Sequence, residues 1–174
     1  HGAPAEIAEL PKLDAILVSH DHYDHLDLPS VRALAAASEA PFITSLGVGQ
    51  RLEALGLPAS RIIELDWWET TDIVNATTGA SLEVRATPSH HFSGRSPFDR
   101  NRTLWSSFVL RSEHRNVYFS GDTGPTRDFE LIRERAIGGG EFDLVMLEIG
   151  AWNEAWGDIH LGPEHALEAF RMLG

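Results

Sequence analysis

Residues 13–26 of the chain read Leu-Asp-Ala-Ile-Leu-Val-Ser-His-Asp-His-Tyr-Asp-His-Leu. The first six residues are mostly apolar, which is typical of a short buried strand. The next residues carry three histidines and two aspartates within six positions. Directly downstream, Asp27 and Pro29 match the N-cap and first-turn signals of a helix. We therefore expect the histidines on a loop between a strand and a helix, where rigid scaffolds often present functional groups.

The histidine-rich loop has the composition of a metal site. Side chains two residues apart in an extended chain point the same way, so His20 and His22 can hold one cation together. Asp24 and His25 lie beyond this pair, where the chain has to bend, and can face a second cation. Imidazole and carboxylate ligands in this mixture suit Zn²⁺, with Mn²⁺ and Fe²⁺ as alternatives. A solvated polar loop without metal is the competing interpretation, and four potential ligands packed so tightly disfavour it.

Two later segments supply further candidate ligands. His90 and His91 follow an alternating strand pattern at residues 81–87, and either could be the third ligand of the first cation. Asp122 stands in Gly-Asp-Thr-Gly, directly after an apolar strand pattern. Such a tetrapeptide alone predicts only a turn. Together with the other two segments, it makes Asp122 the expected bridging ligand, with one carboxylate oxygen for each cation.

Composition narrows the class of protein. The 174 residues, 43% of them hydrophobic, are enough for one domain with a real core, so we expect a single domain over residues 1–174. The net charge of -12 argues against a nucleic-acid partner, because no basic face would neutralise the phosphates. The absence of cysteine leaves His and carboxylates as the only ligands for zinc.

The hydropathy of the sequence bears on whether the protein crosses a membrane and where in the cell it is found. No run approaches the roughly 20 apolar residues of a membrane span, so we expect no transmembrane segment. Peripheral contact with a membrane is an alternative that the sequence leaves open. A cytoplasmic location is expected, although residues 1–4 resemble an interior fragment, so that a lost targeting segment remains open as well.

Hydrophobic periodicity predicts helices and strands mixed along the chain, which indicates an α/β layered sandwich. A polar turn at residues 111–115 predicts a hairpin between two of the strands. The helices are expected at residues 28–38, 47–55, 127–137 and 163–173, and the strands at residues 13–18, 41–45, 62–65, 81–87, 103–110, 116–120 and 142–149.

These motifs resemble a known superfamily. His-x-His-x-Asp-His at residues 20–25, a later His and the Gly-Asp-Thr turn are similar to the metallo-β-lactamase fold superfamily. More narrowly, His91-Phe92-Ser93-Gly94-Arg95, the Asp-Arg-Asn-Arg-Thr-Leu-Trp run at residues 99–105 and Ile-Gly-Ala at residues 149–151 resemble one branch. That branch contains N-acyl-phosphatidylethanolamine phospholipase D and its bacterial relatives. The resemblance implies an αββα sandwich and two zinc ions per subunit.

The resemblance also implies roles for individual residues. His91 is preferred to His90 because the family ligand directly precedes an aromatic residue, here Phe92. His160 matches a family histidine near the site but outside the metal shell, where it would touch substrate or assist proton transfer; a polar residue at a helix start is the alternative. The implied ligands are His20, His22 and His91 for one zinc, Asp24 and His25 for the other, and Asp122 as the bridge.

The chain also departs from the family pattern. The family's seventh ligand, a His followed by Trp-Gly, has no counterpart before Gly174, and the family's first strands are missing, so the resemblance implies a fold that is incomplete at both ends. Glu148 stands where the branch usually carries Pro, and residues 152–158 diverge. Both differences lie near the expected substrate-binding side, so the identity of the substrate stays open.

The expected reaction is hydrolysis. Two cations sharing a water lower its pKa from 15.7 toward about 7, and the resulting hydroxide is the expected nucleophile. Asp24 or His160 would handle the proton. The leading substrate class is a small-molecule or lipid-like phosphodiester. A lactonase of the ascorbate-6-phosphate lactonase type and a non-catalytic metal-binding module are the alternatives.

Side chains near the expected ligands could bind substrate, support the structure or orient the imidazoles. Three arginines after the third ligand could meet a substrate phosphate or bind nearby carboxylates, and we expect a structural role for at least one of them. Other polar residues are candidates for orienting the imidazoles. The arginines are Arg95, Arg100 and Arg102, and the orienting candidates are Ser19, Asp21, Asp27 and Thr123.

Overall fold

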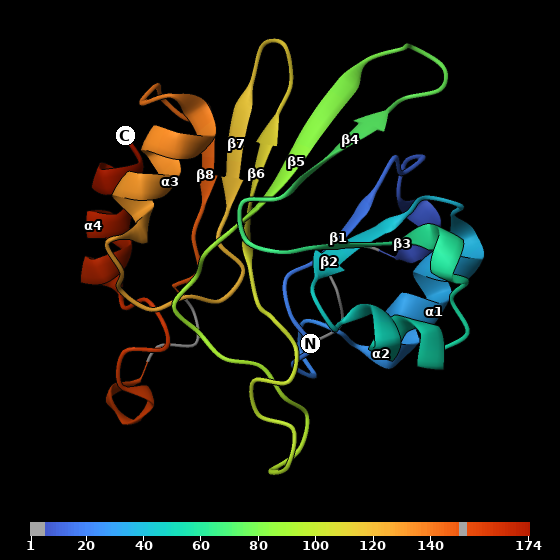
Figure 1. The fold of residues 1–174 in the computed structure, drawn as a ribbon, viewed down its shortest axis with the longest axis horizontal. Coiled ribbons are helices and arrows are strands. Elements are labelled where there is room, and N and C mark those ends of the chain that lie inside the picture. The colour runs from blue at the N-terminus through green and yellow to red at the C-terminus, as the bar shows by residue number, and fades with distance from the viewer. Residues whose placement is uncertain (1–5, 150–152) are drawn as a thin grey trace.

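Two β-sheets lie face to face between two pairs of helices (Figure 1). This computed structural model describes residues 6–149 and 153–174. Gly150 and Ala151 of the motif at residues 149–151, and the first residue of the divergent segment, lie outside the described residues. The order helix, sheet, sheet, helix confirms the αββα sandwich predicted from the sequence.

The smaller sheet is parallel and has the strand order β1-β2-β3. Its two α-helices lie on its outer face (Figure 1). The helix-start signal is confirmed, because the carboxylate of Asp27 accepts a hydrogen bond from the Ser30 backbone N–H at 2.9 Å. The elements of this half are η1 (Ile7–Glu9), β1 (Ile16–Val18), α1 (Leu28–Ala37), β2 (Phe42–Ser45), α2 (Gly49–Ala54), η2 (Ala59–Arg61) and β3 (Ile62–Leu65).

The larger sheet has the order β4-β5-β6-β7-β8. Its first four strands are antiparallel neighbours, and β7 pairs with β8 in parallel after a crossover through α3. Helices α3 and α4 cover its outer face (Figure 1). The elements are β4 (Thr70–Val74), β5 (Ser81–Thr87), β6 (Ser107–Arg111), β7 (Asn116–Phe119), α3 (Asp128–Ile137), β8 (Leu144–Met146), η3 (Glu154–Trp156) and α4 (Pro163–Leu173).

Alternation along the strands divides the core into three clusters. Phe42 packs toward α1 and α2, whereas its neighbour Ile43 packs between the two sheets. Phe108 likewise lies between the sheets, and Val109 faces α3 and α4. All four side chains are almost completely buried, and burying each contributes roughly 1.5–3 kcal/mol. The sandwich therefore holds its strand ends in a rigid frame.

Four strand predictions need correction, and the first is that β1 covers only Ile16–Val18 of the predicted residues 13–18. Strand β4 was not predicted, because every second side chain in it is exposed and only Ile73 reaches the core between the sheets. Strand β6 begins at Ser107 rather than at residue 103, because Leu104 and Ser106 donate their backbone N–H groups to loop carbonyls outside the sheet. Strand β8 covers only Leu144–Met146 of the predicted residues 142–149.

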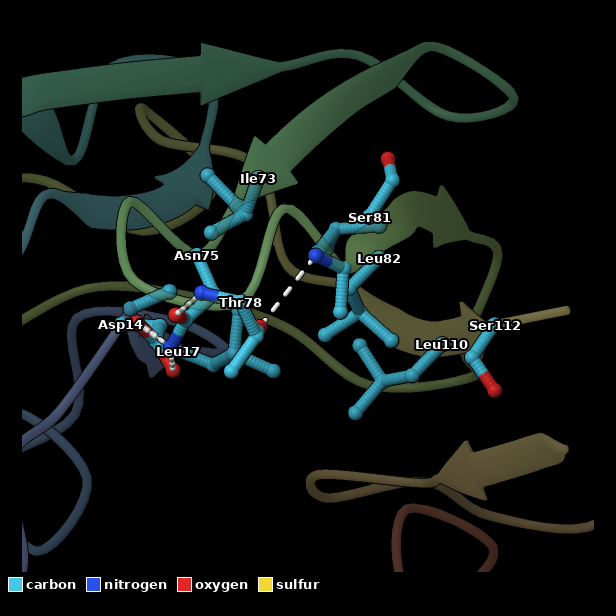
Figure 2. Close-up of a pocket in the computed structure, with 12 residues that line it drawn as sticks. Asp14, Leu17, Ile73, Asn75, Thr78, Ser81, Leu82, Leu110 and Ser112 are labelled. Carbon is cyan, nitrogen blue, oxygen red and sulfur yellow. Dashed lines mark hydrogen bonds between the residues drawn. The ribbon is translucent and has the colours of Figure 1, made fainter.

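A pocket of about 440 Å³ opens between the sheets where β1 and β5 begin (Figure 2). Leu17, Ile73, Leu82 and Leu110 form its apolar wall. Since the histidine loop follows the end of β1, this pocket lies at the opposite end of the strand from it. Among the described residues, no helix is both long enough and apolar enough to cross a membrane.

Candidate metal centre

Four predicted ligands meet at one end of the sandwich. His20 and His22 follow β1 of the small sheet, whereas His91 follows β5 and Asp122 follows β7 of the large sheet. Their candidate ligand atoms all lie within 4.8 Å of one another. The site therefore forms between the sheets rather than within one loop.

Gly121 makes this convergence sterically feasible. Its φ angle is +55°, and a Cβ at this position would lie 2.7 Å from the Ser19 Cβ. A side chain would therefore push the turn that carries Asp122 away from the histidine loop. The glycine of the Gly-Asp-Thr turn is thus required both by backbone conformation and by close packing.

The first ligand group is compact. His20 Nε2 lies 2.9 Å from His22 Nδ1, and His91 Nε2 lies 3.2 Å from that same His22 atom. Asp122 Oδ2 lies 3.6 Å from His91 Nε2 and 3.9 Å from His20 Nε2. Bonds of about 2.0–2.1 Å in a tetrahedral zinc site put neighbouring ligand atoms about 3.3 Å apart. The donor set thus has the chemistry and the size that zinc needs.

Hydrogen bonds set which ring nitrogen is free to bind. His91 Nδ1 donates to the carbonyl oxygen of Ile159 at 3.0 Å, which leaves a lone pair on His91 Nε2. His20 Nδ1 lies 3.0 Å from the Ser19 hydroxyl, and His20 Nε2 faces the group. Outer partners of this kind orient metal-binding imidazoles.

Burial keeps the inner histidines neutral. Desolvation, followed by repulsion from neighbouring histidines, lowers the pKa of His20 to about 2. Desolvation also lowers the pKa of His91 to about 4 and that of His22 below its ordinary value. A neutral imidazole is the form that binds a cation, so these three rings are ready to act as ligands near pH 7.

The second ligand group contains Asp24, His25 and again Asp122. His25 Nε2 lies 3.0 Å from Asp122 Oδ2 and 3.8 Å from Asp24 Oδ2. Burial alone would lower the pKa of His25, but the hydrogen bond and charge of Asp122 raise it above its ordinary value. Burial opposes ionisation of Asp122, yet the hydrogen bond from His25 and the neighbouring histidines lower its pKa to about 2. The side chain of Asp24 is 80% exposed, so this group opens to solvent.

The two groups share one atom. The short contacts of Asp122 with His20, His25 and His91 all involve Oδ2. The sequence led us to expect one carboxylate oxygen for each cation. The geometry instead directs Oδ2 toward both groups.

Other predicted site residues lie around these groups. His90 is turned away, with Nδ1 3.0 Å from the carbonyl oxygen of Pro125. Of the expected orienting residues, Ser19 contacts the rings of His20 and His25. Asp21, Asp27 and Thr123 hold the surrounding backbone through Gly94 N–H, Ser30 N–H and His90 N–H, respectively.

The three arginines have different surroundings. Arg95 donates to the carbonyl oxygens of Asp21 and Leu26 and stacks on the Tyr23 ring, so it has the expected structural role. Arg100 lies over the Phe92 ring at 4.1 Å. That ring in turn contacts His22, with centroids 4.5 Å apart. Arg100 is therefore one aromatic ring away from the ligand His22, and Arg102 is exposed on the same loop.

His160 lies beside the first group, with its ring centroid 5.1 Å from that of His91. Its Nδ1 contacts Glu148, a residue to which no role was assigned from the sequence. Glu148 and His160 form with Asp122 a third set of neighbouring ligand-type atoms. The sequence signal for Glu148 was its place after an apolar strand where the resembling branch carries Pro.

Comparison with known proteins identifies the superfamily of the chain. A family model described as beta-lactamase superfamily domain matches residues 1–174. The chain belongs to the metallo-β-lactamase superfamily. The resemblance inferred from the histidine loop is thereby confirmed.

Members of this superfamily match nearly the whole chain. An uncharacterized protein of Mycobacterium tuberculosis is 45% identical over 97% of this chain and 43% of its own length. A mitochondrial N-acyl-phosphatidylethanolamine-hydrolyzing phospholipase D of Saccharomyces cerevisiae is 35% identical over 98% of this chain and 36% of its own length. The chain thus spans less than half the length of these relatives.

A solved structure shares the fold. The diiron β-hydroxylase CmlA of Streptomyces venezuelae superposes with a TM-score of 0.64 at 21% identity. The match covers 99% of this chain and 34% of CmlA. At this identity the likeness establishes the fold alone.

Proposed function

We propose that this chain carries the catalytic centre of a dinuclear metal-dependent hydrolase that acts on phosphodiesters. The observation that carries the proposal is the position of Asp122 Oδ2 between two ligand groups. In the proposed centre, zinc is the first choice of metal, because the ligands are imidazoles and carboxylates. The first cation would be held by His20, His22 and His91, the second by Asp24 and His25, and Asp122 would bridge them.

Two cations so placed would lower the pKa of a shared water and polarise the scissile group of the substrate. The protein side chains have separate tasks. His91 and His20 keep their Nε2 lone pairs aimed inward through their Nδ1 contacts. Asp24, exposed at the mouth, and His160, at the inner wall, are proposed to move the proton between solvent and the leaving group.

Arg100 supports a phosphate-containing substrate. Its guanidinium lies over Phe92, which contacts His22, so one aromatic ring separates a permanent positive charge from the first ligand group. Guanidinium groups bind phosphate oxygens through paired hydrogen bonds. The relative from Saccharomyces cerevisiae, which by its name hydrolyses a phospholipid, points to the same class of substrate.

Turnover assays on the zinc-loaded protein test this proposal. We expect hydrolysis of bis(p-nitrophenyl) phosphate, loss of activity on chelation and recovery on return of zinc. We expect Arg100→Gln to raise KM more than it lowers kcat, because the arginine binds substrate rather than the reacting atoms. Hydrolysis of a phosphorylated lactone but no phosphodiester would contradict the substrate class and support a lactonase.

An Asp122→Ala variant tests whether the metals are catalytic. We expect loss of metal and of hydrolysis together, whereas Asp72→Ala, an exposed carboxylate on β4, should change neither. If metal content falls in Asp122→Ala while hydrolysis is unchanged, the catalytic claim is wrong.

A further inference from the structure

Glu148 is an acidic side chain at the inner wall of the site that neither proposed cation position uses. It follows β8, and only 11% of its side chain is exposed. An acidic group in such a place needs partners, because desolvating an unpaired carboxylate is costly. Its partners therefore indicate its role.

The two oxygens of Glu148 contact two different segments. Oε2 lies 2.9 Å from His160 Nδ1, and Oε1 accepts the Thr123 backbone N–H at 2.8 Å and the Leu161 N–H at 3.4 Å. The Glu148 N–H donates to the Ser120 hydroxyl at 3.1 Å. One carboxylate thus joins the turn after Asp122 to the loop that carries His160.

This bonding pattern fixes the His160 ring. A carboxylate only accepts, so His160 Nδ1 carries the proton in the neutral ring, and Nε2 keeps a lone pair. His160 Nε2 makes no hydrogen bond to another described residue. Because the ring packs against His91, its orientation relative to the ligand groups is also set.

A third cation position is the competing use of Glu148, His160 and Asp122, whose ligand atoms are neighbours. The contacts argue against it. A cation shared by Glu148 and His160 Nδ1 would have to replace the proton between them, because Nδ1 has no lone pair while it donates to Oε2. The pair is closed by hydrogen bonds, as expected of a positioning contact.

We propose that Glu148 is a positioning residue that selects the Nδ1–H tautomer of the neutral His160 ring and anchors the Asp122 turn through the same carboxylate. For its catalytic consequence this inference rests on the proposed function. The state of the His160 ring, however, can be measured without any substrate.

Glu148→Gln separates the two tasks of the side chain. The amide oxygen can still accept from Thr123, whereas the amide NH₂ would donate to His160 Nδ1 and move the ring proton to Nε2. We expect ¹⁵N-histidine NMR spectra of the zinc-loaded protein to show His160 protonated at Nδ1 in the wild type and at Nε2 in the variant. Glu64→Gln is the matched control, since the Glu64 carboxylate also accepts a backbone N–H, from Gly49 at 2.8 Å.

Kinetic measurements test whether Glu148 acts through His160. We expect Glu148→Gln to lower kcat about 10- to 100-fold with little change in KM. In a His160→Asn background the same substitution should have almost no further effect. If neither protein hydrolyses any substrate, the proposed function fails, and the NMR result still decides the positioning role.

Three results would overturn the inference. The first is an unchanged His160 spectrum in Glu148→Gln. The second is loss of a whole zinc ion per chain in that variant, which would make Glu148 a ligand. The third is a kcat loss that is fully additive with His160→Asn. Should the Gln variant not fold, Glu148→Asp takes its place: it shortens the reach to His160, and an unchanged ring spectrum there would equally overturn the inference.

Discussion

The two ligand groups that share Asp122 differ in burial and in the structures that hold them. His20 and His91 leave the ends of β1 and β5 and are at most 7% exposed. Asp24 is 80% exposed, although only Tyr23 separates it from His22 in the sequence. The difference arises because the chain turns after His22, whose carbonyl oxygen accepts the N–H groups of His25 and Leu26. One short motif thus serves both a buried and an open group.

Because of this difference, we expect the two cation positions to differ in affinity. The buried group offers three imidazoles that desolvation keeps neutral, and outer hydrogen bonds orient two of them, His20 and His91. The open group offers one histidine, one exposed carboxylate and the shared Asp122. We therefore expect tight binding at the first position and weaker, exchangeable binding at the second.

Removing a buried ligand should have the largest effect. His20→Ala deletes one of the three imidazoles that face each other at the first position. We expect zinc affinity there to fall by more than about 100-fold, since a ligand contributes more than the partner that orients it, and hydrolysis to vanish. Metal analysis by mass spectrometry and phosphodiester turnover measure this. His114→Ala, an exposed histidine on the β6–β7 hairpin, is the control and should match the wild type.

Removing the exposed ligand should have a smaller and separable effect. We expect Asp24→Ala to lose the second ion only and to keep the first, with a lower kcat. The free energy of unfolding of the metal-free protein should change by less than about 0.5 kcal/mol, because the side chain is exposed. Loss of both ions in this variant would show that the two positions are not independent.

The pH dependence of the metal-free protein should report the buried group. The pKa of His91 is lowered to about 4 and that of His20 to about 2, whereas both titrate near 6.5 when unfolded. The unfolded chain therefore binds more protons between pH 6.5 and 4, so stability should fall as the pH drops through this window. His25, whose pKa is raised, opposes the trend. Urea unfolding at several pH values measures it, and His91→Asn should flatten the slope.

Removing an orienting hydroxyl should have the smallest effect. Ser19 contacts His20 Nδ1 at 3.0 Å and His25 Nδ1 at 3.4 Å. We expect Ser19→Ala to weaken zinc binding about 10-fold without loss of an ion at saturation. Ser107→Ala removes a buried hydroxyl that pairs with Thr87 instead, and its zinc affinity should be unchanged.

Much of the fold could be predicted from local patterns. The Asp27 cap, the parallel strands around α1 and the hairpin between β6 and β7 follow from residues close in sequence. Strand β4 was missed because the antiparallel pairing with β5, and not its own half-exposed pattern, stabilises it. The support that a strand gains from pairing with its neighbour is not encoded in its own hydrophobic period.

The candidate site, like the fold, could be predicted from the sequence only in part. The residue types and spacing of the histidine loop pointed to a metal centre, and the family resemblance selected His91 over His90. The role of Arg95 depends on a contact across the fold, with Leu26, and that of Glu148 on a contact with His160, 12 residues later in the chain. No spacing rule predicts either contact.

Two cation positions that share Asp122 but differ in affinity are tested most directly by a titration in zinc buffers. Zinc per chain and phosphodiester turnover are measured at each free zinc concentration. We expect two steps, with one ion bound first and hydrolysis appearing with the second. A single step that ends at one ion, or full hydrolysis with only the first ion bound, would contradict this expectation.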